Sequence, residues 1–159
     1  MTRLKDAFVK AGVRRFESEA GLGRLGVPLD RQDYHDLPDG VLAEYREKLD
    51  DVHAGLIERI EPDDIYTTGF DGYDGHTDHI EVHNSILRVV RRLGAAGIGI
   101  HALNSRHEGT LIVPATYHKL GAMACHVSQQ AVDDLLYWSG TDLYTPLIRD
   151  AETYDVLAL

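Results

Sequence analysis

Apolar residues recur at helical spacing over four long stretches of the chain, and these stretches predict helices. The cleanest pattern runs from Val41 to Ile60 and ends before Pro62, because proline cannot continue a helix. Three other helices are expected at Arg3–Arg24, at about His76–Leu93 and at about Ala115–Trp138. Glycines within the N-terminal helix predict one or two breaks in it. The helix that starts at about His76 is expected to end at Gly94 or Gly97.

Short apolar runs bounded by turn-forming residues lie between these helices and predict strands. They are Val27–Tyr34, Asp64–Thr68, Ile98–Leu103 and Leu111–Pro114. The pair Asp39-Gly40 is a strong turn signal ahead of the second helix. The tail, residues 141–159, is too irregular to predict more than a short helix. Helices alternating with strands indicate an α/β protein with a mostly parallel sheet, built as a single domain over residues 1–159.

Composition is that of a soluble globular protein, with 159 residues, 43% hydrophobic and 26% charged. No apolar run approaches the ~20 residues that a membrane helix needs. The first residues also lack the apolar core of a signal peptide, so we expect a cytoplasmic protein.

Charge and cysteine usage narrow the possible partners. The net charge of -10 argues against nucleic acid, because binding to phosphates requires a basic face. The single cysteine, Cys125, excludes an internal disulfide and a zinc site built from several cysteines. A metal ion would therefore need histidine and carboxylate ligands.

Candidate chemistry gathers between Thr67 and His83, where the chain passes from a predicted strand through a glycine-rich loop into a helix. Ligands bind at this position in α/β proteins. His76, His79 and His83 share one helix face, since they are three and four residues apart. A histidine pair at this spacing can reach one metal ion, but the zinc-peptidase version needs a glutamate where Ile80 stands. That version fits poorly.

Different roles for the individual residues explain the sequence of the loop better than a histidine pair that binds one metal ion. Asp78 would orient a neighbouring imidazole, one histidine would bind zinc, and another would act as an acid or oxyanion donor. The alternative is a set of surface residues at a helix start, with Asp78 complementing the helix dipole.

The loop also resembles a known family. Gly75-His76-Thr77-Asp78-His79, following the Asp64–Thr68 strand, resembles the second signature of the zinc-dependent N-acetylglucosaminyl deacetylases, the PIG-L or LmbE-like family. Segments elsewhere are similar to the family's R-x-x-E helix, L-G-V segment, L-P-D-G turn and K-x-x-A-x-x-x-H-x-S-Q helix. They are Arg14–Glu19, Leu25–Val27, Leu37–Gly40 and Lys119–Gln129.

The resemblance implies a Rossmann-like three-layer α/β fold with a mostly parallel sheet, from which the N-terminal strands of the family fold are missing. It also implies an enzyme that removes the acetyl group of an amino sugar or its conjugate with a zinc-bound water. By resemblance, His79 is the zinc ligand, His76 is the acid or electrophile facing the tetrahedral intermediate, and Asp78 orients and charges His76. Zinc lowers the pKa of its bound water toward ~7 and polarises the carbonyl. Substrate contacts are also expected at Asp39, Arg14 and His126. The alternatives are a turn aspartate, an arginine on a helix surface and a structural histidine, respectively.

One part of the family pattern has no counterpart here. The H-P-D-D-E signature, which supplies two further zinc ligands and the general base, is absent. The chain therefore resembles the C-terminal two-thirds of such a domain. Three explanations fit this pattern: a truncated deacetylase, complementation by another chain, and a degenerate, non-catalytic relative. A deletion through a parallel sheet would disrupt folding, so truncation is the favoured explanation, and we expect this segment alone to be inactive. Exposed strand edges would favour a homo-oligomer. The rival function is a non-catalytic binding or assembly module.

Overall fold

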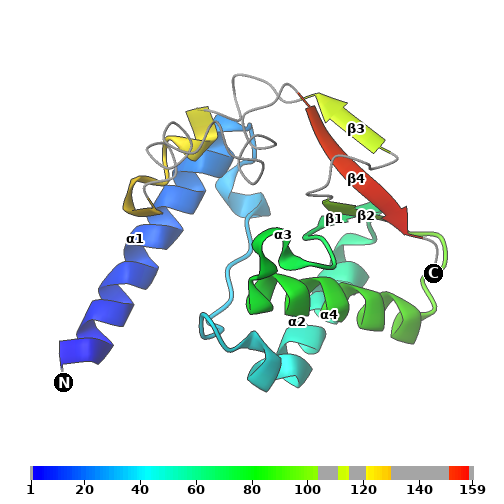
Figure 1. The fold of residues 1–159 in the computed structure, drawn as a ribbon, viewed down its shortest axis with the longest axis horizontal. Helices are drawn as coiled ribbons and strands as arrows, with labels where there is room; N and C mark the ends of the chain where they lie inside the picture. The colour runs from blue at the N-terminus through cyan, green and yellow to red at the C-terminus, as the bar shows by residue number, and fades with distance from the viewer. Residues whose placement is uncertain (1, 104–110, 115–120, 130–150, 158–159) are drawn as a thin grey trace. The chain divides into compact units, whose positions relative to one another are not determined.

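The computed structural model describes residues 2–103, 111–114, 121–129 and 151–157 (Figure 1). The chain divides into two compact units. The first comprises Met1–Tyr34 and Pro114–Asp150, and the second comprises His35–Val113 and Ala151–Leu159. The prediction of a single domain remains untested by this division. Among the described residues no helix is both long and apolar enough to cross a membrane.

Two helices dominate the second unit. Helix α2 (Arg46–Ile60) follows a 3₁₀ turn, η2 (Leu42–Tyr45), so its α-helical part begins later than the apolar pattern predicted. It ends at Glu61, whose left-handed φ of 49° and following proline stop the helix as predicted. Helix α4 (Thr77–Leu93) ends at Gly94, with φ 64°. The predicted end at this glycine is therefore confirmed.

The sheet of the second unit has the strand order β1-β2-β4-β3. Its strands are β1 (Asp64–Thr67), β2 (Gly99–Leu103), β3 (Leu111–Pro114) and β4 (Ala151–Leu157). Strands β1 and β2 are parallel, whereas β4 runs antiparallel to β2. The α/β prediction is confirmed. The short helix expected in the tail is wrong where the tail is described, because residues 151–157 form β4, and residues 154–157 of that strand pair with β2.

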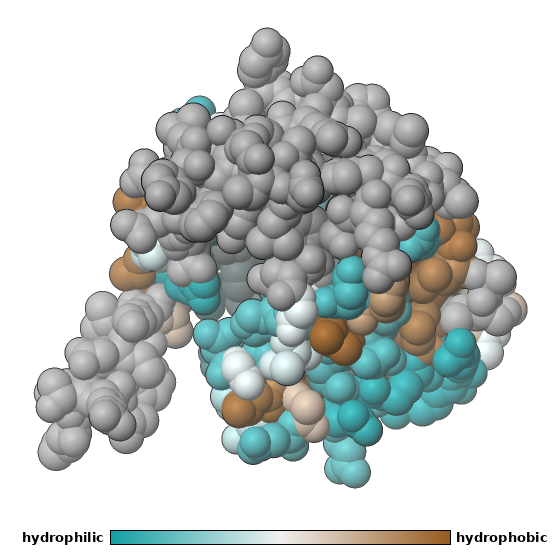
Figure 2. All heavy atoms as spheres, in the orientation of Figure 1, coloured by the Kyte–Doolittle hydropathy of each residue, from teal (hydrophilic) through white to brown (hydrophobic). Residues whose placement is uncertain are grey.

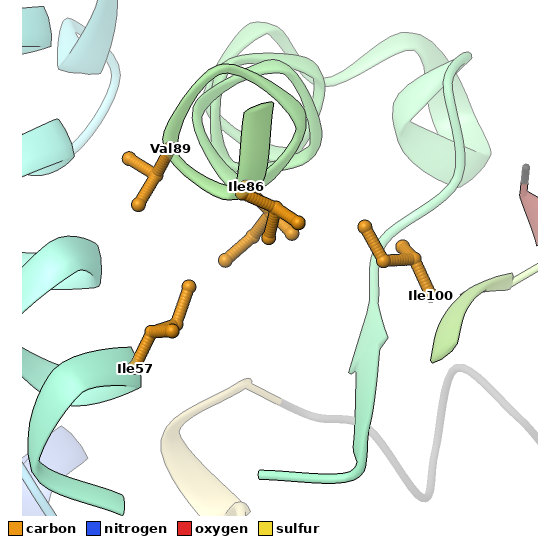
Figure 3. Packing of buried hydrophobic residues seen from close by; sticks show 5 residues of the cluster. Ile57, Ile86, Val89 and Ile100 are labelled. Carbon is orange, nitrogen blue, oxygen red and sulfur yellow. The ribbon is translucent and has the colours of Figure 1, made fainter. Parts of the chain in front are cut away.

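The core of this unit lies between α2, α4 and β2. It contains Ile57, Ile86, Val89, Val90 and Ile100, each no more than 8% exposed. Figure 3 shows Ile57 from α2, Ile86 and Val89 from α4 and Ile100 from β2 pointing toward one another. Full burial of one such side chain contributes roughly 1.5–3 kcal/mol. The core therefore fixes the helix that carries the histidines.

Strand register sorts the sheet residues onto two faces. Ile65, Ile100 and Leu157 form one cross-strand row and pack with the core. The next row contains Tyr66, and its side chain is 55% exposed on the opposite face. On the view in Figure 2, hydrophilic residues cover most of the coloured surface, and hydrophobic residues gather in patches.

Two expectations for the first unit are corrected. Helix α1 (Thr2–Arg24) is continuous, so its glycines cause no break. Residues 27–34 form no strand; they contain a 3₁₀ turn, η1 (Leu29–Arg31). The carbonyl oxygen of Val27 accepts a hydrogen bond from the Gln32 side chain at 2.8 Å. In a strand, this carbonyl would accept from the backbone of a neighbouring strand instead.

The third predicted helix is also different. Residues 121–123 are helical, but a turn follows and η3 (Val127–Gln129) is a 3₁₀ helix. A continuous helix through residues 115–138 is therefore wrong in its described part. Residues 115–120 and 130–138 of that prediction lie outside the described residues.

Candidate functional site

The loop from β1 to α4 makes a tight path that requires glycine at two positions. Gly69 packs so closely on the carbonyl of Leu103 that a side chain would collide with it. Gly72 begins the short helix α3 (Gly72–Gly75) with φ +68°, and a Cβ there would lie 3.0 Å from Cγ1 of Ile80. The loop backbone is thereby pressed against the first turn of α4.

His79 is oriented by this loop. Its Nδ1 lies 3.1 Å from the carbonyl oxygen of Gly72. A carbonyl can only accept, so Nδ1 carries the proton and Nε2 is the unprotonated nitrogen of the neutral ring. Such a bond from one ring nitrogen to a backbone carbonyl is how proteins orient a metal-binding histidine.

His76 is the N-cap of α4 and has the opposite arrangement. Its Nδ1 accepts a hydrogen bond of 3.2 Å from the backbone N–H of Asp78, so the proton of the neutral ring is on Nε2. The rings of His76 and His79 lie 4.7 Å apart between centroids, tilted by 31°. Both histidines are exposed. The loop thus brings together an imidazole with an Nε2 lone pair and one with an Nε2 proton.

Asp78 is buried, with 6% of its surface exposed. Its carboxylate accepts from the backbone N–H of Gly40 at 2.5 Å and of Leu42 at 3.0 Å. These partners differ from the predicted one, because the described contact of Asp78 with His76 runs through the Asp78 backbone N–H. Asp78 therefore ties the turn at residues 39–42 to the start of α4, and its catalytic role stays a prediction.

His83 belongs to the supporting structure. It is 4% exposed, and its Nδ1 donates to the carbonyl of Thr68 at 2.8 Å. The hydroxyl of Thr68 in turn donates to the carbonyl of His79 at 2.7 Å. Two hydrogen bonds thus hold the end of β1 against α4.

A polar network between α2 and α4 was missed by the sequence reasoning. Glu81, 5% exposed, accepts from Arg46 at 3.1 Å and from Arg88 at 2.7 Å. Arg88 also donates to Asp50 at 2.7 and 3.0 Å, and Asp50 accepts from Ser85 at 2.5 Å. The available signal was the spacing of Glu81, Ser85 and Arg88, which places them on one face of α4.

Charge in this network is compensated. Burial opposes ionisation of Glu81, but hydrogen bonds from Arg46 and Arg88 outweigh it and hold the pKa of Glu81 below its usual value. The Arg88 hydrogen bond likewise lowers the pKa of Asp50. Both carboxylates are therefore ionised at neutral pH and keep α4 fixed against α2.

The weaker substrate candidates lie in both units. Asp39 is an exposed residue of the turn that Asp78 holds. Arg14 is exposed on α1, and His126 is partly buried in the first unit with Nε2 close to Gly21. A Cβ at Gly21 would lie 3.1 Å from that nitrogen. Substrate binding by these three residues stays a prediction.

Within the first unit, two motif segments of the sequence meet. Glu17, 6% exposed, accepts from the backbone N–H and the hydroxyl of Ser128, both at 2.6 Å. These bonds lower the pKa of Glu17. The R-x-x-E segment and the H-x-S-Q segment are therefore in direct contact.

The described residues supply only part of a zinc site. No group of three histidine, cysteine or carboxylate side chains able to hold a metal ion occurs among them. A catalytic zinc ion takes three protein ligands. The ring of His79 is oriented as in a metal-binding histidine, with Nδ1 bonded to a backbone carbonyl. The Asp78 carboxylate, in contrast, accepts hydrogen bonds from backbone amides. The described donor set therefore does not by itself fit a catalytic zinc ion.

Fold and loop together define an α/β protein with a histidine pair at a strand-to-helix junction, where α/β proteins bind ligands. The family model described as PIG-L: GlcNAc-PI de-N-acetylase matches residues 5–90, more than half of the 159 residues. The chain belongs to the PIG-L family, as the sequence motifs predicted, and is a deacetylase-type domain. The resembling segment at residues 119–129 lies beyond the match. No curated protein and no solved structure matched the chain.

Proposed function

We propose that this chain carries part of a zinc-dependent site for N-deacetylation of N-acetylated amino sugars or their conjugates, with His79 as one zinc ligand. The observation that carries the proposal is the hydrogen bond from His79 Nδ1 to the Gly72 carbonyl. This bond selects the tautomer in which Nε2 can ligate a metal ion. The family match supplies the chemical class.

His76 would act at the acetamide carbonyl. Its Nδ1 is engaged by the helix backbone, so the proton on Nε2 is the one that the neutral ring can donate. A donor placed where negative charge develops on the carbonyl oxygen stabilises the tetrahedral intermediate. The 4.7 Å separation of the rings puts this donor next to the proposed ligand.

Zinc binding is the first test. After equilibrium dialysis against zinc, elemental analysis should find about one zinc ion per chain, and His79→Ala should weaken binding by tenfold or more. His35→Ala, which removes an exposed histidine of the same unit, is the matched control and should bind like the wild type. Equal zinc binding by wild type and His79→Ala would contradict the assignment of His79, and so would a wild type that binds no zinc.

Hydrolysis separates the two candidate functions. Amine release from an N-acetylglucosamine conjugate by the zinc-loaded chain, reduced about 10²- to 10³-fold in His76→Ala, would support the deacetylase. Zinc binding without amine release would favour the second candidate, a non-catalytic binding or assembly module. That candidate is supported by the finding that no group of three side chains able to hold a metal ion occurs among the described residues.

A further inference from the structure

His83 lies one helical turn beyond His79 on the same face of α4. His79 is exposed, whereas His83 is only 4% exposed and has no role in the proposed site. Its Nδ1 lies 2.8 Å from the carbonyl oxygen of Thr68. A carbonyl oxygen only accepts, so Nδ1 of His83 carries a proton. The buried histidine therefore has one donor directed at the start of the histidine loop.

Thr68 connects His83 to His79. It is the first residue after β1, and both its carbonyl and its hydroxyl contact α4. The carbonyl accepts from His83, and the hydroxyl donates to the carbonyl oxygen of His79 at 2.7 Å. Thr68 is therefore held at two positions one turn apart on α4, and these contacts fix where the loop leaves the strand.

The loop returns to α4 at Gly72. On the way, Gly69 packs against the carbonyl of Leu103, so the backbone passes close to β2 there. The carbonyl oxygen of Gly72 lies 3.1 Å from Nδ1 of His79. Figure 1 shows the short helix α3, which begins at Gly72, beside the start of α4. The acceptor that orients the His79 ring thus belongs to a loop that His83 anchors at its other end.

From these contacts we propose that His83 is a positioning residue for His79, acting through Thr68 and the Gly72 carbonyl. It keeps Nδ1 of His79 bonded to that carbonyl and so favours the neutral tautomer with the lone pair on Nε2. An exposed neutral imidazole can hold its proton on either nitrogen, so this preference depends on the placement of the carbonyl. The inference rests on the proposed function only for the use of that lone pair.

NMR of the metal-free chain with ¹⁵N-labelled histidine tests this inference, because the ring nitrogen shifts distinguish the two neutral tautomers. Loss of a signal in His79→Ala identifies the ring, which the wild type should hold mainly in the Nδ1–H form. His83→Leu removes the donor, and the ratio of the Nδ1–H to the Nε2–H tautomer of His79 should fall about fivefold, the factor that corresponds to one ordinary hydrogen bond. His83→Asn supplies an amide N–H in place of Nδ1 and should restore the wild-type ratio.

The second step of the connection has its own pair of variants. Thr68→Val removes the hydroxyl that bonds the His79 carbonyl, and the tautomer ratio of His79 should fall here too. This variant decides the question if His83→Leu does not fold. Thr68→Ser keeps the hydroxyl and should keep the wild-type ratio.

A loss of stability by itself should not change this readout. Val89→Ala shortens a core side chain away from the loop, so it should lower the free energy of unfolding and leave the His79 tautomer unchanged. Equal ratios in the wild type, His83→Leu and Thr68→Val would overturn the inference. So would a wild type without a preferred His79 tautomer, a ratio in His83→Asn as low as in His83→Leu, or an equal fall in Val89→Ala. Because no zinc is present, a chain that fails to bind zinc would contradict the proposed function and leave this measurement unaffected.

Discussion

The hydrogen bonds of individual side chains decide what the residues of the histidine loop can do. His79 and His76 are three residues apart, yet one donates from Nδ1 to Gly72 and the other accepts at Nδ1 from Asp78. Their Nε2 atoms therefore differ in chemistry. Asp78 is fully used in holding two backbone amides, which gives it a structural role independent of any reaction.

Asp78→Asn tests that structural role. An amide retains one acceptor oxygen for two backbone donors, so the N–H of Gly40 or of Leu42 loses its charged partner. We expect the free energy of unfolding to fall by about 1–3 kcal/mol, measured by urea denaturation. Asp51→Asn, an exposed carboxylate on α2, should change it by less than about 0.5 kcal/mol. Equal stabilities for both variants would show that Asp78 is dispensable to the fold.

Gly72 offers a second test at this scale. Both Gly72 and Gly75 have positive φ, +68° and +83°, but only at Gly72 would a new Cβ meet other atoms within 4 Å. Gly75→Ala should cost about 1–2 kcal/mol from backbone strain alone. Gly72→Ala should cost about 1–3 kcal/mol more because of the clash with Ile80. Thermal or urea unfolding measures the difference, and a Gly72→Ala variant as stable as Gly75→Ala would contradict the packing described.

At the scale of elements, α4 is held on three sides. Ile86 and Val89 pack in the core, Glu81 and Arg88 pair with α2, and His83 bonds the end of β1. Removing one partner of a partly buried ion pair leaves the other charge uncompensated. The histidine-bearing end of α4 thus depends on contacts well beyond the loop.

The pH dependence of stability should report the contact between α2 and α4. Burial lowers the pKa of His53 in the fold below its unfolded value near ~6.5, and Asp50, His35 and Arg88 are the charged or titratable groups that act on it. The unfolded chain therefore binds a proton more readily than the folded chain. Above pH ~6.5, His53 therefore contributes nothing to the free energy of unfolding. As the pH falls below ~6.5, the unfolded chain takes up the proton first, and His53 lowers the free energy of unfolding.

Urea midpoints between pH 8 and pH 5 measure this effect. The wild type should lose stability as pH falls through ~6.5, and His53→Gln should lose less over the same interval. Glu58→Gln is the control for the helix and should keep the wild-type slope. A steeper slope in His53→Gln would show that His53 is not held neutral by burial.

At the scale of the whole molecule, the chain consists of two units that each bring together distant segments. In the first unit, Glu17 meets Ser128 across 111 positions of sequence. In the second, β4 joins β2 although more than forty residues separate them. Each unit is therefore closed by a segment from the C-terminal part of the chain.

Glu17→Gln tests the closure of the first unit. The amide of Gln replaces a charged acceptor with a neutral one, so the Ser128 N–H should exchange with deuterium faster than in the wild type. Hydrogen-exchange mass spectrometry of peptides covering residues 121–129 measures this change. Glu19→Gln, whose carboxylate pairs with Arg15 on the surface of α1, should leave exchange in those peptides unaltered. An unaltered Glu17→Gln variant would contradict the described contact.

The sequence by itself determined the local elements and the family. Apolar spacing predicted α2, α4, β1, β2 and their stops, because periodicity, proline and glycine act within a few residues. The motif Gly75–His79 placed the histidines at a strand-to-helix loop and identified the family, which the match over residues 5–90 confirmed.

Only the tertiary structure decided which partner each polar side chain has. Asp78 bonds amides 36 and 38 residues away, and Ser85 bonds an aspartate 35 residues away. Residues 151–157 became a strand because β2 offered an edge, although their own pattern was irregular. Such contacts depend on how separate elements pack together in space. The pattern of residues along the sequence does not give the distances between those elements.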